Sequence, residues 1–280
     1  MLGTLTGWAK AHKGSIAEHT YVTCDGETWA CFGESSGGKE ITRGAGSTAM
    51  AHCISLPAQT AGIVYGLSGL CHQAANRILW PARTLVTGAR GYWLSALLYG
   101  TYGTSDLEWL ARMGMCSCFT GESSHFDKTA KKDEHEVIRL GRADRAYHRS
   151  VRTLYSKAFM LQDLPGTRER GAIDINILAR DRDLLMDYKL GENYRPGKRK
   201  SIMKRLRRFH STKKQLDRAL HMEELSLREY TTRVNAEAEF FLDFCAGLLG
   251  NEDYTRLIGI KPGENIKVVD EIIASEFLAF

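Results

Sequence analysis

Two patterns of hydrophobic and polar positions divide this chain. Residues 1–105 are rich in Gly, Ser, Thr and aromatic residues, and their apolar positions fall in short runs. Residues 127–250 are dominated by charged residues and leucine that recur with helical spacing. We therefore predict a core in residues 1–126 and a mainly helical part in residues 127–280 that packs on it.

The first part contains a predicted β-hairpin. His19–Cys24 and Thr28–Phe32 are short β-prone runs, and Asp25-Gly26 between them is a strong two-residue turn signal. The runs 83–87 and 92–99 flank a glycine-containing turn and predict a second hairpin, with a short helix as the alternative for the second run. Together these runs predict a small antiparallel sheet.

The other elements are predicted from helical periodicity, capping residues and turn residues. One helix begins at Cys71 and ends before Pro81, because a residue that precedes proline avoids helical geometry. The glycine-rich segments 35–38 and 44–47 are predicted loops. Further helices are predicted at 105–113, 128–161, 202–222 and 225–249, and a last strand at 265–269. The pattern as a whole predicts an α+β fold.

Composition is that of an ordinary globular protein, with 43% hydrophobic and 25% charged residues among 280. The first residues do not look like a secretory signal, and no apolar stretch approaches the roughly 18 residues that span a bilayer. We therefore expect a soluble, cytoplasmic protein, with delivery into another cell as an effector left open. Seven cysteines, an odd number, favour free thiols in a reducing compartment.

Cys71 is the leading candidate nucleophile. It lies at a predicted helix start, where backbone N–H groups and the helix dipole favour a thiolate and can hold an oxyanion. A thiol nucleophile needs a base, and His19 at the start of a predicted strand is the candidate. His72 is less suitable, because consecutive helical residues point about 100° apart. The alternatives are a small buried cysteine and a hydrogen-bonded structural histidine.

This arrangement resembles the circularly permuted NlpC-type branch of the papain-like cysteine hydrolase and acyltransferase superfamily. The resemblance covers residues 19–100 and rests on His19-Thr-Tyr-Val with Asp25-Gly26, followed by Gly69-Leu-Cys71-His-Gln. It implies a papain-like catalytic core in residues 1–126. It also implies that Cys71 attacks an amide or ester bond of a peptide or acyl-ester substrate and forms an acyl-enzyme.

Other residues of the predicted site are less clearly defined. Members of this branch place a third polar residue, often His, on the next strand, but Glu34 is the nearest group here that can accept from the imidazole of His19. Gln73 is a candidate donor to the oxyanion, with a solvated helical side chain as the alternative. Cys53, which follows His52, is a second candidate nucleophile, although its surroundings lack a clear helix start.

Neither a metal nor another cofactor is expected. Cys116-Ser-Cys118 with His125 lacks the usual C-x2-C spacing and a second pair of ligands. The glycine-rich segments match neither a phosphate-binding P-loop nor a dinucleotide-binding motif.

A basic run occupies residues 195–214 and contains ten Lys and Arg and no acid. Because the formal net charge is +5, the rest of the chain carries a net charge of −5. Such a helix can contact an anionic membrane or nucleic-acid phosphates, and it can also be a core-packed helix with a solvated face. Apolar residues line one side of it: Ile202, Met203, Leu206, Phe209, Leu216 and Leu220. The candidate anion-binding residues are Lys204, Arg205, Arg207 and Arg208.

Two functions are therefore predicted. The first is a thiol hydrolase or acyltransferase that uses Cys71 and His19. The second is a non-enzymatic module that binds an anionic partner, a membrane surface or a nucleic acid, through residues 195–214.

Overall fold

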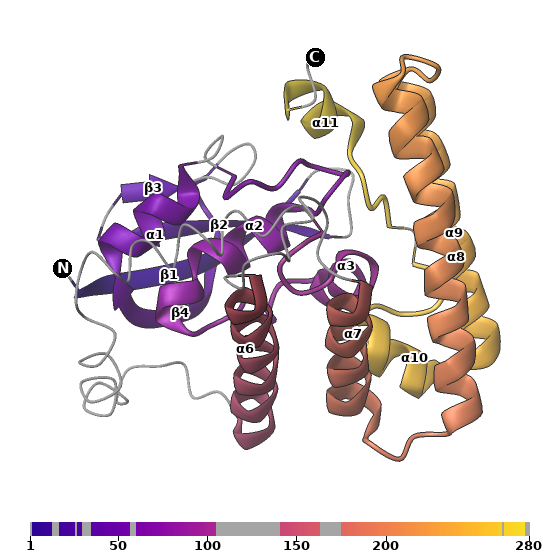
Figure 1. Cartoon of the computed structure of the whole chain (residues 1–280), viewed down its shortest axis with the longest axis horizontal. Coiled ribbons are helices and arrows are strands. Elements are labelled where there is room, and N and C mark those ends of the chain that lie inside the picture. The colour runs from indigo at the N-terminus through magenta and orange to yellow at the C-terminus, as the bar shows by residue number, and fades with distance from the viewer. Residues whose placement is uncertain are drawn as a thin grey trace.

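An antiparallel sheet and the helix that begins at Cys71 form the centre of the molecule (Figure 1). The computed structural model describes residues 2–12, 17–25, 27–29, 35–56, 60–104, 141–162, 175–264 and 266–277. Within these ranges the chain has an α+β fold, as predicted. The first two predicted strands are present, joined at Asp25.

The sheet described here has four strands in the order β3-β2-β1-β4, and every neighbouring pair is antiparallel. The central strand β1 was not predicted from the sequence. The strands are β1 (Leu2–Ala11), β2 (Glu18–Cys24), β3 (Glu27–Trp29) and β4 (Lys39–Ser47).

The predicted loop at 44–47 is wrong, because these residues form the end of β4. Their glycines allow the backbone of the short 3-10 helix η2 (Trp80–Ala82) to approach the strand. A Cβ atom on Gly44 would lie 2.6 Å from the Ala82 carbonyl oxygen, and one on Gly46 would lie 2.8 Å from the Ala82 nitrogen. Glycine here serves close packing instead of a turn.

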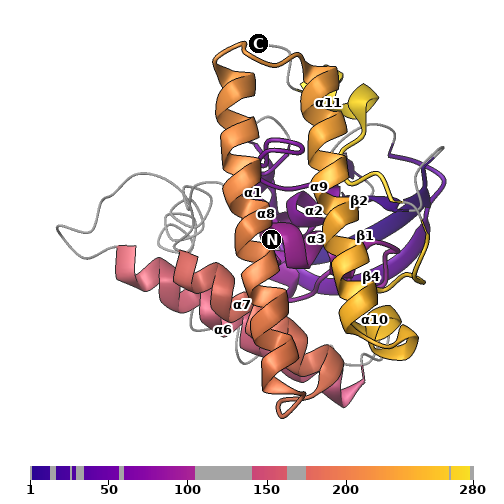
Figure 2. The same cartoon turned by 90° about the vertical axis from the view of Figure 1, so that its right-hand side faces the viewer.

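Helices cover the sheet and extend to one side of it. In Figure 1, α6 and α7 lie below the sheet, and Figure 2 shows α8 and α9 as a long antiparallel hairpin in front of it. The α-helices are α1 (Thr48–Ser55), α2 (Cys71–Ile78), α3 (Tyr92–Tyr99), α6 (Arg142–Gln162), α7 (Ile175–Leu190), α8 (Pro196–His221), α9 (Leu227–Leu248), α10 (Asn251–Ile258) and α11 (Glu271–Phe277).

Most of the long predicted helices are confirmed. The predicted helix that begins at Cys71 is α2 and ends at Ile78, before Pro81, and the two predicted helices at 202–222 and 225–249 correspond to α8 and α9. Helix α8 starts six residues early, at Pro196, because proline is favoured in the first turn of a helix. The predicted helix at 105–113 and the beginning of the one at 128–161 lie outside the described residues.

The second hairpin is wrong. Residues 92–99 form α3, the alternative for this run, and residues 83–87 form no strand. Seven of the eight residues of α3 are buried, and a short run that is apolar on all sides has the same pattern in a buried helix and a buried strand.

The predicted last strand is also wrong for its described residues, 266–269. A side chain satisfies their backbone instead of a strand partner. Asn235 of α9 accepts hydrogen bonds from the N–H groups of Val268 and Val269 and donates one to the Val269 carbonyl.

Every residue of α2 is buried, including four polar ones. Asn76 donates to the Thr101 carbonyl at 2.8 Å and accepts from the Val86 N–H at 2.9 Å. Arg77 donates to the carbonyls of Tyr102 and Ala61 at 2.6 and 2.8 Å. These side chains satisfy backbone groups of irregular segments that have no strand or helix partner.

Two charged residues of α7, Asp181 and Arg182, join the helical part to this core. Asp181 accepts hydrogen bonds from the N–H and the hydroxyl of Thr101, and burial raises its pKa. Arg182 donates to the carbonyls of Leu97 and Leu98 at the end of α3. The last carbonyls of a helix have no partner within it, so Arg182 serves as a cap from another element. No helix in the described ranges has the length and hydropathy needed to cross a bilayer.

We expect Asn76→Ala to lower the free energy of unfolding by about 3 kcal/mol, because it leaves a buried N–H and a buried carbonyl without partners. Urea denaturation measures this change. The exposed Asn193 provides the matched control, and Asn193→Ala should change stability by less than about 0.5 kcal/mol. Equal effects of the two substitutions would contradict the structural role of Asn76.

Candidate functional site

Cys71 is the first residue of α2, as predicted, and its side chain is buried at 8% exposure. Burial raises the pKa of the Cys71 thiol. Hydrogen bonds from the backbone of Thr20 and from the start of α2 lower this pKa but do not outweigh burial. The helix start is therefore present without the exposure that a reactive thiolate requires.

His19 lies on the other face of the sheet from Cys71. Thr20 faces α2, and neighbouring strand residues point to opposite faces. His19 instead stacks with Tyr21, which stacks with Trp8 on the adjacent strand. Its Nε2 is buried with no hydrogen-bond partner in the described structure, and burial lowers the pKa of His19 to about 4. Among the described residues no hydrogen bond joins His19 to Cys71, although His72, the residue after Cys71, is near enough to contribute to the lowered pKa of His19.

His72 connects three elements. Its Nε2 lies 3.0 Å from the Glu18 carbonyl, and its Nδ1 lies 2.8 Å from the Ser95 hydroxyl. Because a carbonyl only accepts, Nε2 carries the hydrogen that is donated to Glu18. Burial lowers the pKa of His72 to about 4, so the ring is neutral near pH 7. His72 thus attaches β2 and α3 to α2.

Gln73 does not fit its predicted role as a donor to an oxyanion. Its oxygen accepts from the Leu70 N–H, and its nitrogen donates to Ser95 and to the Gly100 carbonyl. The whole amide is therefore used inside the core, and Gln73 is fully buried. Position 73 gave no sign of this in the sequence, since a helical Gln is more often solvated.

The other predicted residues of the thiol site are not gathered around Cys71. Glu34 lies outside the described residues. Cys53 lies within α1 and is partly exposed, and the neighbouring His52 is exposed. The Cys116, Cys118 and His125 group also lies outside the described residues, and no cluster that could hold a metal occurs among those described.

Two open depressions lie in the C-terminal half, and neither is lined by Cys71 or His19. One of about 700 Å³ is lined by Asn251, Arg256 and Lys261, among others. The other, of about 320 Å³, lies beside Asn235 and Glu271. Neither contains a cluster of catalytic groups.

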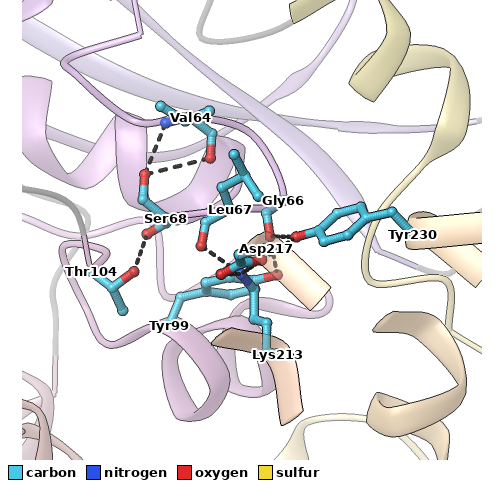
Figure 3. A network of polar contacts seen from close by, with 9 residues as sticks. All are labelled: Val64, Gly66, Leu67, Ser68, Tyr99, Thr104, Lys213, Asp217 and Tyr230. Carbon is cyan, nitrogen blue, oxygen red and sulfur yellow. Dashed lines mark hydrogen bonds and ion pairs between the residues drawn. The ribbon is translucent and has the colours of Figure 1, made fainter. Parts of the chain in front are cut away.

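The loop that leads to Cys71 is held by α8 and α9 (Figure 3). Lys213 donates to the Leu67 carbonyl at 2.7 Å and to both carboxylate oxygens of Asp217 at 2.8 Å. Tyr230 donates to Asp217 at 2.7 Å and lies 3.2 Å from the Gly66 carbonyl. Lys213 is buried, so this member of the basic run is a structural residue.

Other cations of the basic run also face inward. Lys198 donates to the Leu248 carbonyl at 2.5 Å, and Arg199 forms ion pairs with Asp183 and Asp187 of α7. Arg205 is 6% exposed and lies 3.6 Å from Glu237 of α9. The prediction that Arg205 binds an external anion is therefore wrong, because its guanidinium is enclosed between the two helices.

The remaining cations form one exposed row, which we call the α8 basic face. Its members lie on the side opposite the buried Ile202, Leu206 and Phe209, because their positions differ by about whole numbers of helical turns. At 1.5 Å per residue the row is about 27 Å long. Within the part of the chain that the structure describes, none of its side chains forms an ion pair with an acid. The face consists of Lys200, Lys204, Arg207, Arg208, Lys214 and Arg218.

Three of the predicted residues, Lys204, Arg207 and Arg208, belong to this face. Lys200, Lys214 and Arg218 were not named from the sequence. The sequence signal for these three residues is their spacing relative to the apolar residues of α8, because this spacing separates the cations that face the core from those that face solvent. Glu223 and Glu224 follow at the end of α8, so the face is most positive between residues 200 and 214.

Comparison with family models, with curated proteins and with solved structures gives no match to this chain.

We expect Cys71 to react slowly with iodoacetamide at pH 7 in the folded protein, because its thiol is buried and its pKa is raised. Cys53 is partly exposed and should be alkylated first. Peptide mass spectrometry over a time course distinguishes the two sites, and denatured protein gives the reference rates. Alkylation of Cys71 as fast as Cys53 would contradict this result.

We also expect His72 to contribute to acid destabilisation. A pKa of about 4 in the folded state and 6.5 in the unfolded state means that the unfolded chain binds the proton first, so stability falls from pH 6.5 toward pH 4. Between pH 7.5 and pH 5, the free energy of unfolding of His72→Gln, measured by urea denaturation, should fall by about 2 kcal/mol less than that of the parent. The exposed His221→Gln is the control, and an unchanged slope in His72→Gln would disprove the assignment.

Proposed function

We propose that this protein binds nucleic acid through the α8 basic face, by contacts to phosphates that do not depend on base sequence. The observation that carries the proposal is a row of six exposed cations on a helix whose other side is fixed in the core. Asp217 is the one acid of α8 within this span, and it is paired with the buried Lys213. Phosphates repeat along a nucleic-acid strand, so a linear row of Lys and Arg can neutralise several of them at once and release the counterions bound to them.

The geometry favours nucleic acid over a membrane as the partner. A helix that binds a bilayer surface inserts its apolar side among the lipids. The apolar side of α8 is not available for this, because Ile202, Leu206 and Phe209 have 0% exposure in the core. The α8 basic face can therefore bind a partner only through its charges, and such binding requires a partner that presents many phosphates in a row.

Neutralising part of the α8 basic face tests the proposal. The triple variant Lys204→Gln, Arg207→Gln and Arg208→Gln should bind oligonucleotides about tenfold or more weakly at low salt. The slope of log Kd against log salt should fall by about 2 to 3, since each lost phosphate contact removes about 0.7 to 0.9. Fluorescence anisotropy over a salt series measures both quantities.

Helix α6 offers a control with the same change in charge. Arg142, Arg145 and Arg149 are also exposed, and their replacement by Gln should leave affinity and salt slope within about twofold of the parent. Equal losses of affinity in both triple variants would mean that binding depends only on the net charge of the protein, and this result would contradict the proposal. Binding to phosphatidylserine vesicles without binding to oligonucleotides would also contradict it.

Thiol catalysis within a permuted papain-like core is the second candidate, and one observation favours it. Cys71 begins α2, and α2 packs on β2, the strand that carries His19. For this mechanism the side chain of His19 would have to reach the other face of the sheet. Labelling by an acyl-directed electrophile that is lost in Cys71→Ala and kept in Cys53→Ala would support it.

A further inference from the structure

An exposed aromatic ring lies beside the α8 basic face. Phe240 of α9 is 57% exposed, whereas the neighbouring Phe241 is buried. Single exposed apolar residues are common, so exposure alone gives no function to this ring. The residues around Phe240 indicate what this ring could bind.

One side of the Phe240 ring rests on a buried guanidinium. The central carbon of Arg205 lies 4.1 Å from the ring centroid, within the range of a cation–π contact. The guanidinium nitrogens of Arg205 are buried without hydrogen bonds, so the ring and the carboxylate of Glu237 are its close partners. This contact fixes the ring in place, and its exposure then comes from the opposite side.

Charged residues of both signs surround the exposed ring, and Glu237 and Asp243 lie one turn before and after it on α9. Two members of the α8 basic face are close to Arg205 on α8: Lys204 precedes Arg205 directly, and Arg208 lies three residues after Arg205, about one helical turn away. On α9 the exposed Arg233 precedes Phe240 by two turns and lies on the same side of that helix. A flat aromatic surface beside a row of exposed cations is a combination that proteins use to hold single strands.

We propose that Phe240 is a stacking platform for an unpaired base, so that the α8 basic face takes single-stranded nucleic acid. This inference rests on the proposed function and deepens it by naming the class of strand. Phosphates lie along the cations of α8, and one base stacks on the open side of Phe240. A duplex keeps its bases stacked on one another, so it gains only the phosphate contacts.

The test compares strands that differ only in their bases. Labelled oligo(dT) and an abasic oligonucleotide with the same number of phosphates are titrated with the parent protein and with Phe240→Leu. Leucine keeps an apolar cover over Arg205 but has no aromatic face. Phe240→Leu should bind oligo(dT) about 5- to 140-fold more weakly than the parent, the range that loss of one stacked base gives. Its affinity for the abasic strand should not change.

Two further variants complete the experiment. Phe240→Trp should bind oligo(dT) at least as tightly as the parent, because it keeps the aromatic face. Leu56→Ala removes an equally exposed apolar residue near the sheet and should change no affinity. Thermal unfolding of each variant sets a temperature at which all are folded.

The outcomes separate the two proposals. Parent protein that binds oligo(dT) and the abasic strand equally well, or Phe240→Leu that binds oligo(dT) like the parent, overturns the stacking platform and leaves phosphate binding standing. Failure of the parent to bind any oligonucleotide overturns the proposed function and the platform with it.

Discussion

The need to satisfy buried backbone groups determines the centre of this molecule. Segments around Ala61, Val86 and Thr101 pass through the core without strand or helix partners, and an unpaired buried N–H or carbonyl costs about as much as a lost hydrogen bond. The polar side chains of α2 supply the missing partners. This requirement explains why α2 is buried on all sides although half of its residues are polar.

The same requirement places on α2 the residue types from which a thiol site was predicted. A cysteine at a helix start, followed by polar side chains, is typical of a nucleophile with its supporting residues, and a polar core contains the same residue types. The difference lies in what those side chains bond. Gln73 bonds backbone groups of the core, and His72 bonds a carbonyl and a hydroxyl there. The position of His19 adds a second difference, since strand alternation gives Cys71 a threonine as its neighbour.

Local signals were sufficient for part of the fold. The turn at Asp25 and the long helices could be predicted because their patterns arise from neighbouring residues. The end of β4, helix α3 and residues 266–269 could not, because packing with distant segments decides them. Gly44 and Gly46 allow contact with Ala82, and Asn235 provides the bonds that a strand would have given to Val268 and Val269. At the site, spacing gave the apolar side of α8, whereas only the packed structure shows that Arg205 is enclosed.

The charges on α8 follow two different rules. Inward cations bond acids or carbonyls, as Arg199 and Lys213 do, and they contribute to packing. Outward cations repel one another at spacings of four residues, as Lys200 does Lys204, and each such pair destabilises a helix by about 0.2–0.5 kcal/mol. An exposed helix that needed only to be solvated would reduce this repulsion by mixing acids into the same side. An unmixed row therefore opposes the stability of α8, and a polyanion that binds along it removes that repulsion.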